Sequence, residues 1–160
     1  MAIIHTRKGE AIIVDDADFD ELSKFTWRLN NSGYAMRDLP RPRPRPKPET
    51  KCAELMHRRI LGLTPDDHRH GDHINFNRTD NRRENLRIAT FSNSQAHRRT
   101  RKDNKSGHKG VYWRNDIGKF EAQIRINGKL KRLGYFDDEN TASKSFSKAA
   151  KEQYGEFALS

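Results

Sequence analysis

The chain has 160 residues, of which 32% are hydrophobic and 34% charged, and its net charge at pH 7 is +10. So low an apolar fraction excludes one large hydrophobic core and favours small units joined along the chain. No stretch approaches the roughly 20 apolar residues of a membrane span, and a single cysteine, Cys52, excludes an internal disulfide, which fits a reducing, cytoplasmic compartment.

The positive charge is concentrated after residue 40. Residues 1–40 carry 5 Lys and Arg against 7 Asp and Glu, a net of −2, whereas the remainder carries +12. A basic body of this kind indicates a polyanionic partner, most simply nucleic acid. A membrane surface is not expected as a partner because no basic helix with a broad apolar face is visible, and no obligate protein partner is evident.

Residues 1–40 predict a small β-rich support region. β-Branched residues flank Gly9, and Asn, Ser and Gly form a turn-prone sequence at 30–33. The predicted elements are strands at 2–6 and 11–14, a helix from Asp15 or Asp16 to Leu22, and a hairpin of strands at 25–29 and 34–37. We expect Trp27 and Tyr34 to be core residues.

Residues 41–50 predict a basic arm, because they contain the sequence RPRPRPKP. Alternating proline prevents a helix and removes the donors of a strand ladder, so the segment should be extended and exposed. Two interpretations remain open, an arm that lies along phosphates and a solvated loop tip.

Residues 72–97 combine the side chains of a reaction centre. Asp72 and His73 follow a strand-like apolar run at 55–61 and a polar turn at 66–71, and a second strand-like run begins at Asn85. Ser92 can then cap a short helix that carries Asn93, Ser94 and His97. Two strands and a helix bury little apolar surface, so a bound metal ion would help to hold them. An Asp beside a His also fits a capped turn with a hydrogen-bonded imidazole.

The motifs in this stretch resemble the HNH endonuclease family. They are MHRRILG at 56–62, DHIN at 72–75 and DNRRENLR at 80–87. The likeness is to phage and intron-encoded homing endonucleases, and it implies a ββα-metal domain at 51–98. It also implies double-stranded DNA as the substrate and a phage or intron origin within a bacterial host.

The resemblance assigns roles to individual residues. His73 matches the general base, Asn85 the residue that orients its imidazole, and Asp72 a ligand of one divalent ion, magnesium or manganese. A neutral imidazole can accept a proton near pH 7, and a carboxylate oxygen suits a hard cation. His57 and Arg58 match positions beside the site.

Ser94 departs from the family pattern, which places a metal-binding His or Asn there. His97 is three residues later on the same helix face. We expect His97, or Ser94 through a water molecule, to be the substitute ligand. The alternative is a degenerate centre in a non-catalytic DNA-binding protein. An RNA-binding or ribosome-associated protein would suit the charge but not the motifs.

After a basic linker at 99–105, residues 106–160 predict a second domain. Strands are expected at 110–114, 120–126 and 130–136, with Asn127-Gly128 as a hairpin turn, and a helix at 139–154 that ends at Gly155. In the middle strand Phe120, Ala122, Ile124 and Ile126 alternate with polar residues, so the helix should cover one face.

This second domain resembles the ethylene-response-factor, or AP-two, type of DNA-binding domain. The matching segments are SGHKGVYWR, GKFEAQIRINGK and RLGYFDDENTAS. The resemblance implies that the polar face of the sheet enters the major groove, where Arg reads guanine and Gln reads adenine. The positions implied to face DNA are Tyr112, Trp113, Arg114, Lys119, Gln123, Arg125 and Arg132.

The combined expectation is an α+β chain with a β-rich start, a ββα-metal HNH centre and a sheet packed on one helix. The function that follows is a metal-dependent homing endonuclease that hydrolyses phosphodiester bonds, by nicking, in duplex DNA.

Overall fold

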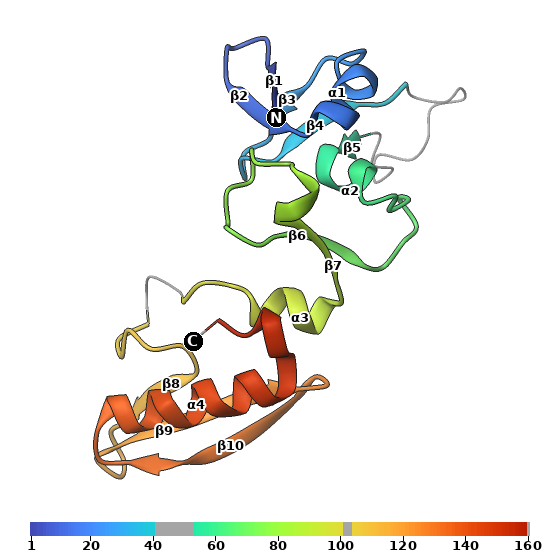
Figure 1. The fold of residues 1–160 in the computed structure, drawn as a ribbon. Coiled ribbons are helices and arrows are strands. Elements are labelled where there is room, and N and C mark those ends of the chain that lie inside the picture. Colours follow the sequence, from blue (N-terminus) through green and yellow to red (C-terminus); the bar gives the residue numbers. More distant parts are fainter. Residues whose placement is uncertain (41–52, 101–103, 160) are drawn as a thin grey trace. The chain divides into compact units, whose positions relative to one another are not determined.

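The computed structural model describes residues 1–40, 53–100 and 104–159. The chain forms two compact units, Met1–Ala89 and Thr90–Ser160, and each is described by itself (Figure 1). The Pro/Arg arm at 41–50, Cys52 and the linker residues Arg101 and Lys102 lie outside the described residues, so the predictions made for them stay predictions.

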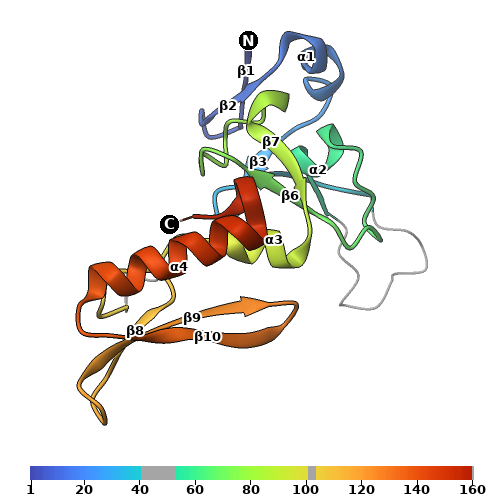
Figure 2. The same ribbon diagram turned by 60° about the horizontal axis from the view of Figure 1, so that its bottom comes forward.

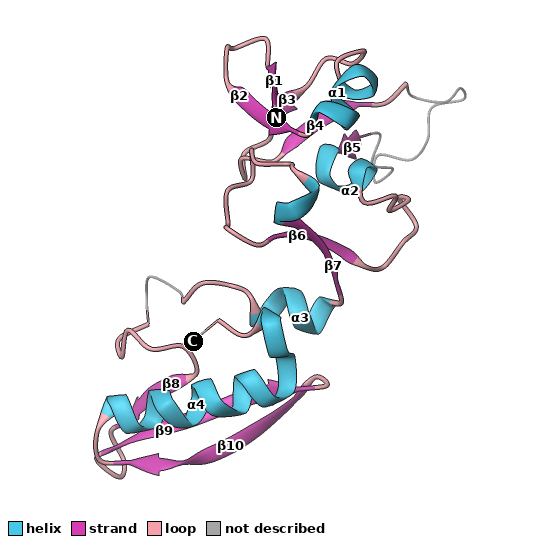
Figure 3. Ribbon diagram, viewed as in Figure 1, coloured by secondary structure: helices cyan, strands magenta, loops and turns pink. Residues whose placement is uncertain are grey.

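The first unit consists of short antiparallel strands and short helices (Figure 3). Its elements are β1 (Ala2–His5), β2 (Ala11–Val14), α1 (Asp16–Leu22), β3 (Arg28–Leu29), β4 (Ala35–Asp38), β5 (Ala53–Leu55), α2 (Met56–Ile60), β6 (His70–His73), the 3₁₀ turn η1 (Arg83–Asn85) and β7 (Leu86–Ala89). Strands β1 and β2 pair, β3, β4 and β5 form a second sheet in that order, and β6 pairs with β7. The predicted N-terminal strands, helix and hairpin are therefore confirmed.

One core joins the N-terminal region to the segment that carries the HNH-like motifs. Trp27 is 1% exposed and packs in the same cluster as Met56 and Leu86. Its indole Nε1 donates to the Leu22 carbonyl at 2.8 Å, which satisfies the polar edge of the ring. The prediction that Trp27 is a core residue is confirmed, whereas Tyr34 is half-buried and contacts two histidines instead.

The strand predicted around 55–61 is wrong in part. Only Ala53–Leu55 is extended, and Met56–Ile60 forms helix α2. Met56 and Ile60 are both buried, and their separation of four residues places them on one helical face. The four-residue spacing of Met56 and Ile60 therefore favours a helix over a strand in this segment.

The second unit is a three-stranded sheet with a helix across one face (Figure 2). Its elements are α3 (Phe91–Ala96), β8 (Val111–Arg114), β9 (Lys119–Ile126), β10 (Lys129–Phe136), α4 (Glu139–Tyr154) and the 3₁₀ turn η2 (Gly155–Phe157). The strands are antiparallel in the order β10-β9-β8. The predicted sheet and helix are confirmed.

Local sequence explains the ends of these elements. Asn127 and Gly128 have φ of 49° and 78°, the left-handed pair that a two-residue hairpin turn requires. Helix α4 begins after Asp138, whose Oδ1 accepts from the Thr141 backbone N–H at 2.9 Å, and it ends at Gly155.

The covered face of the sheet holds the core of the second unit. Ala122 and Ile124 of β9 are buried against Ala142 and Phe146 of α4 in two adjoining clusters. A Cβ on Gly110 would lie 2.2 Å from Phe146 Cδ2, so this position has no room for a side chain. Among the described residues no helix is long and apolar enough to cross a membrane.

Candidate active site

Strand β6 carries Asp72 and His73 on opposite faces of a two-stranded ribbon. In the register with β7, Asp72 lies opposite Arg87 and His73 opposite Leu86. Neighbouring residues of a strand point to opposite faces, so the two side chains have different surroundings. The Asp72 carboxylate accepts a hydrogen bond from Arg87 Nε at 2.9 Å, in a half-buried ion pair.

Side chains from three other parts of the first unit surround His73. It is 4% exposed, and its ring centroid is 5.0 Å from that of His57 and 5.7 Å from that of Tyr34. Its Nε2 is 3.4 Å from Oδ1 of Asn81. Burial lowers the pKa of His73, against smaller raising effects of Asn81 and of nearby carboxylates. The imidazole is therefore neutral at pH 7 and able to accept a proton.

His57 is a second buried imidazole. It is 4% exposed, and its Nδ1 has no hydrogen-bond partner among the residues that the structure describes. Burial, followed by the charges of His73 and Arg58, lowers the pKa of His57 to about 3. A neutral His57 adds no positive charge beside His73.

Arg58 holds the loop before β6. Its guanidinium donates to the backbone carbonyls of Arg69 at 2.9 Å and Asp67 at 3.0 Å. These contacts bring the 64–69 turn onto α2. The described hydrogen bonds of Arg58 are with backbone carbonyls, and its place beside a reaction centre stays a prediction.

Asn85 contacts the loop between β6 and β7. Its Oδ1 accepts from the Asn75 backbone N–H at 2.9 Å, and its Nδ2 donates to the Asp80 carbonyl at 2.8 Å. The side-chain amide that approaches the His73 ring is that of Asn81. Sequence reasoning did not single out Asn81, although it lies within the DNRRENLR motif.

The N-terminal hairpin holds the same loop from the other side. The backbone N–H of Ile13 donates to Thr79 and its carbonyl accepts from Asn81, both at 2.8 Å. Arg83 of η1 also forms an ion pair with Asp18 of α1 at 2.7 Å. The region that the sequence suggested as a support therefore helps to build the site.

Ser94 and His97 belong to the second unit and are fixed within it. Thr90 caps helix α3, since its Oγ1 accepts from the Asn93 backbone N–H at 3.1 Å, so the prediction of Ser92 as the cap is wrong. The chain leaves β7 at Ala89, which makes Thr90 the first residue able to cap. Ser94 lies in the helix, and His97 is its 7% exposed C-cap residue.

The Asp72 carboxylate is a candidate ligand for a hard divalent cation. Within the described ranges no group of three or more His, Cys, Asp and Glu could hold an ion. Mg²⁺ keeps several waters and often binds through one or two carboxylates together with substrate phosphates. Asp72 can supply one such carboxylate.

The open face of the C-terminal sheet carries an ion-pair network centred on Glu121. Its Oε2 is 2.7 Å from Arg114 Nη1 and its Oε1 is 2.6 Å from Arg132 Nε. Arg132 and then Arg114 lower the pKa of Glu121, which is only 5% exposed. Two of the positions implied to face DNA are thus held in place by one carboxylate.

The other residues implied to face DNA do not contact Glu121 through a described ion pair. Tyr112 and Trp113 are about half exposed, and Lys119 forms an ion pair with Asp137 at 2.8 Å. Arg125 Nη1 donates to the Gly128 carbonyl at 2.7 Å, and Gln123 is half-buried.

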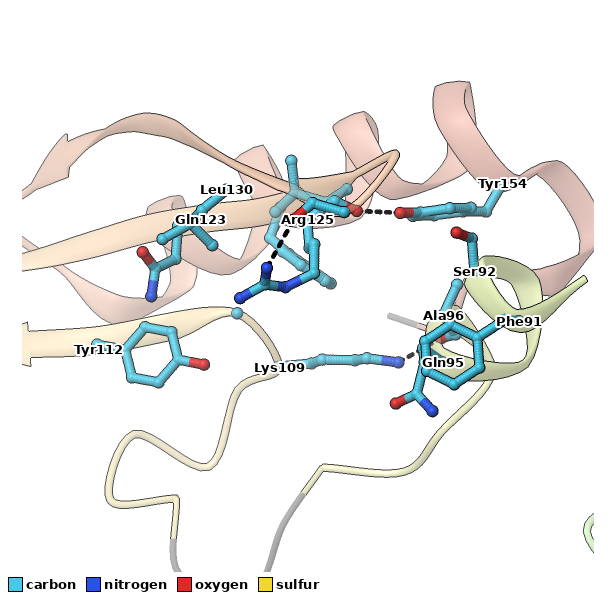
Figure 4. Close-up of a pocket in the computed structure, with 14 residues that line it drawn as sticks. Phe91, Ser92, Gln95, Ala96, Lys109, Tyr112, Gln123, Arg125, Leu130 and Tyr154 are labelled. Atoms are coloured by element: carbon cyan, nitrogen blue, oxygen red, sulfur yellow. Dashed lines mark hydrogen bonds between the residues drawn. The ribbon is translucent and has the colours of Figure 1, made fainter.

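Tyr112, Gln123 and Arg125 line a cavity of about 400 Å³ within the second unit (Figure 4). Lys109, also at its wall, donates through Nζ to the carbonyls of Ala96 and Arg98 at the end of α3. Burial lowers the pKa of Lys109 to about 8. Lys109 therefore connects the loop before β8 to the C-terminal end of α3, the helix that carries Ser94.

Comparison with known proteins gives one relative. The chain is 28% identical over 152 residues to an uncharacterized HNH endonuclease of Acanthamoeba polyphaga mimivirus, a match that covers 94% of this chain and 74% of the relative. No family model matches the chain. No solved structure matches it. The HNH name belongs to that relative, and the AP-two likeness rests on the motifs of residues 106–160 alone.

Proposed function

We propose that this protein is a metal-dependent endonuclease of the HNH, homing type that nicks duplex DNA. The observation that carries the proposal is the buried imidazole of His73, whose pKa is lowered by burial, on the strand that also carries the neighbouring residue Asp72. The HNH name of the relative that matches 94% of the chain supports the same function.

In this mechanism His73 is the general base. Its imidazole takes a proton from a water molecule as the water oxygen bonds to the scissile phosphorus. The bond from phosphorus to the 3′ oxygen breaks, and that oxygen takes a proton from solvent. A general base of this kind contributes ~10²–10⁴ to the rate.

Asp72 would hold one magnesium or manganese ion through its carboxylate. We keep His97, or Ser94 through a water molecule, as the proposed further ligand on the sequence pattern alone. When bound, such an ion stabilises negative charge on the phosphate and the leaving oxygen. Arg87, whose Nε lies 2.9 Å from an oxygen of Asp72, holds that carboxylate in place.

The second unit would bring the centre to its target. The open face of the AP-two-like sheet would present Tyr112, Gln123 and Arg125 to the major groove. Arg114 and Arg132 on the same sheet form ion pairs with Glu121. Joining a DNA-reading module to a weakly selective catalyst raises the local concentration of the catalyst at the bound site.

The experiment is incubation of the full chain with supercoiled plasmid and magnesium or manganese, with a chelator as control. We expect conversion to the nicked circle that stops with chelator and with His73→Ala. His68→Ala, at an exposed histidine, serves as the matched control and should nick at the wild-type rate. Comparable cleavage by His73→Ala would remove His73 from the mechanism.

A second candidate function is a non-catalytic DNA-binding protein. It is favoured by Ser94, which stands at the position where the HNH pattern has a His or Asn, and by the pairing of Asp72 with Arg87. Duplex binding without nicking under every metal condition would select this second function.

A further inference from the structure

Asn81 is the most completely buried polar side chain near His73. Its exposure is 0%, and its Oδ1 lies 3.4 Å from His73 Nε2. The Nδ2 of the same amide has no partner among the residues that the structure describes. A buried donor without a partner is destabilising, so an amide at this position lowers the stability of the folded state.

We propose that Asn81 is a positioning residue that fixes the tautomer of His73, with its amide oxygen accepting a hydrogen bond from the Nε2–H of the ring. A neutral imidazole has one N–H and one lone pair. With the proton on Nε2, the lone pair that receives the proton of water lies on Nδ1. The catalytic consequence rests on the proposed function, whereas the tautomer itself does not.

The backbone around Asn81 keeps the amide aimed at the ring. Ile13 of β2 donates to Thr79 and accepts from Asn81, both at 2.8 Å, so an edge of the N-terminal hairpin grips the loop on either side of Asp80. Arg82 and Asn75 hold the Asp80 carboxylate at 2.8 and 2.9 Å. The amide therefore has little freedom to turn away.

The remaining neighbours fix the plane of the imidazole without competing for its nitrogens. The ring of His57 meets that of His73 edge to face at 71°, and the Tyr34 ring is tilted by 46° to it. Asn81 supplies the directional contact, and these two rings restrict rotation. The distance of 3.4 Å is long for a hydrogen bond, a common condition of catalytic contacts before substrate binds.

The opposite orientation of the amide makes a different prediction. If Nδ2 faced His73, it would donate to Nε2, and the proton of the ring would lie on Nδ1. An ionised carboxylate at position 81 can only accept. The variant Asn81→Asp therefore keeps a proton on Nε2 if Asn81 accepts, and moves the proton there if Asn81 donates.

The test is long-range ¹H–¹⁵N NMR of the His73 ring in the full-length chain at about pH 8, where the ring is neutral. We expect Nε2 to carry the proton in the wild type and in Asn81→Asp, and the isosteric Asn81→Leu to show a mixture of tautomers. Asn31→Leu, at an exposed turn, is the matched control and should behave as the wild type. A proton on Nδ1 of the wild type would overturn the proposal, as would an unchanged tautomer in Asn81→Leu.

Nicking kinetics provide the second readout. In Asn81→Leu we expect kcat to fall by roughly tenfold or more with little change in duplex affinity, because only the base is affected. If Asn81→Leu does not fold, the comparison of wild type with Asn81→Asp still decides the tautomer. Absence of nicking by the wild type would count against the nuclease function. The NMR result would still decide the tautomer of His73.

Discussion

The imidazole rings of His57 and His73 lie edge to face, with centroids 5.0 Å apart. This pair joins helix α2 to strand β6, and both rings are 4% exposed. Burial lowers the pKa of both histidines, so the folded state favours their uncharged forms.

The first prediction is that His57 makes the protein less stable in acid. Its pKa is lowered from 6.5 to about 3 by burial, so between these values the unfolded chain binds a proton that the folded chain does not. The free energy of unfolding is therefore not reduced by His57 above pH 6.5, and it decreases as the pH falls from 6.5 towards 3. From pH 7.5 to 5 the loss should be about 2 kcal/mol.

Urea unfolding of the wild type and of His57→Gln at both pH values measures this effect. Gln does not titrate, so the variant should lose about 2 kcal/mol less than the wild type over the same interval. Equal losses in the two proteins would show that His57 is protonated in the folded state as readily as in the unfolded state.

The second prediction is that Gly71→Ala disrupts the histidine pair. The new Cβ would lie 2.4 Å from His57 Cδ2, and we expect a loss of about 1–3 kcal/mol from overpacking. Adding His57→Ala should relieve the clash, so the double variant should be more stable than the sum of the two single effects implies. A double-mutant cycle by urea unfolding measures this coupling, and additive effects would exclude the steric contact.

The third prediction concerns the ligand that replaces the residue expected at Ser94. If His97 is that ligand, His97→Ala should weaken Mn²⁺ binding by roughly tenfold or more, and Ser94→His should preserve or strengthen it. Calorimetric titration with Mn²⁺ alone, followed by nicking at limiting metal, checks both effects. Full metal affinity in His97→Ala would leave Asp72 with waters or Ser94 as the site.

The fourth prediction is that Glu121 lowers the affinity for duplex DNA and raises the discrimination between DNA sequences. In Glu121→Gln the guanidinium groups of Arg114 and Arg132 lose their shared counter-ion, although Arg114 keeps its ion pair with Asp116 at 2.8 Å. Arg132 then becomes available to phosphates. Binding of any duplex should then depend more steeply on salt, by about one to two units of slope, and discrimination between sequences should fall.

Fluorescence anisotropy across a salt series measures this change. Glu152→Gln removes the same charge from an exposed position of α4 and is the control, for which we expect little change in discrimination. Equal effects of the two substitutions would show that only net charge matters.

The sequence by itself determined the elements whose signals are local. Asn127-Gly128 specified its hairpin, Asp138 and Gly155 specified the ends of α4, and alternation along β9 identified the covered face. These features depend on residues close together in the chain, where turn geometry, capping and strand periodicity act directly. Asp72 and His73 were singled out from the sequence because they are adjacent in the chain, and the structure places both on β6.

The tertiary structure alone decided what surrounds His73. Tyr34 and His57 reach its ring from β-hairpin and helix segments far away in sequence, and Asn81 is held there by Ile13 of the N-terminal hairpin. No local pattern encodes such contacts, since they arise when separate elements bury their apolar faces in one core. For the same reason Asn85 was expected at the imidazole, whereas the folded loop turns its amide to the backbone and brings Asn81 to the ring.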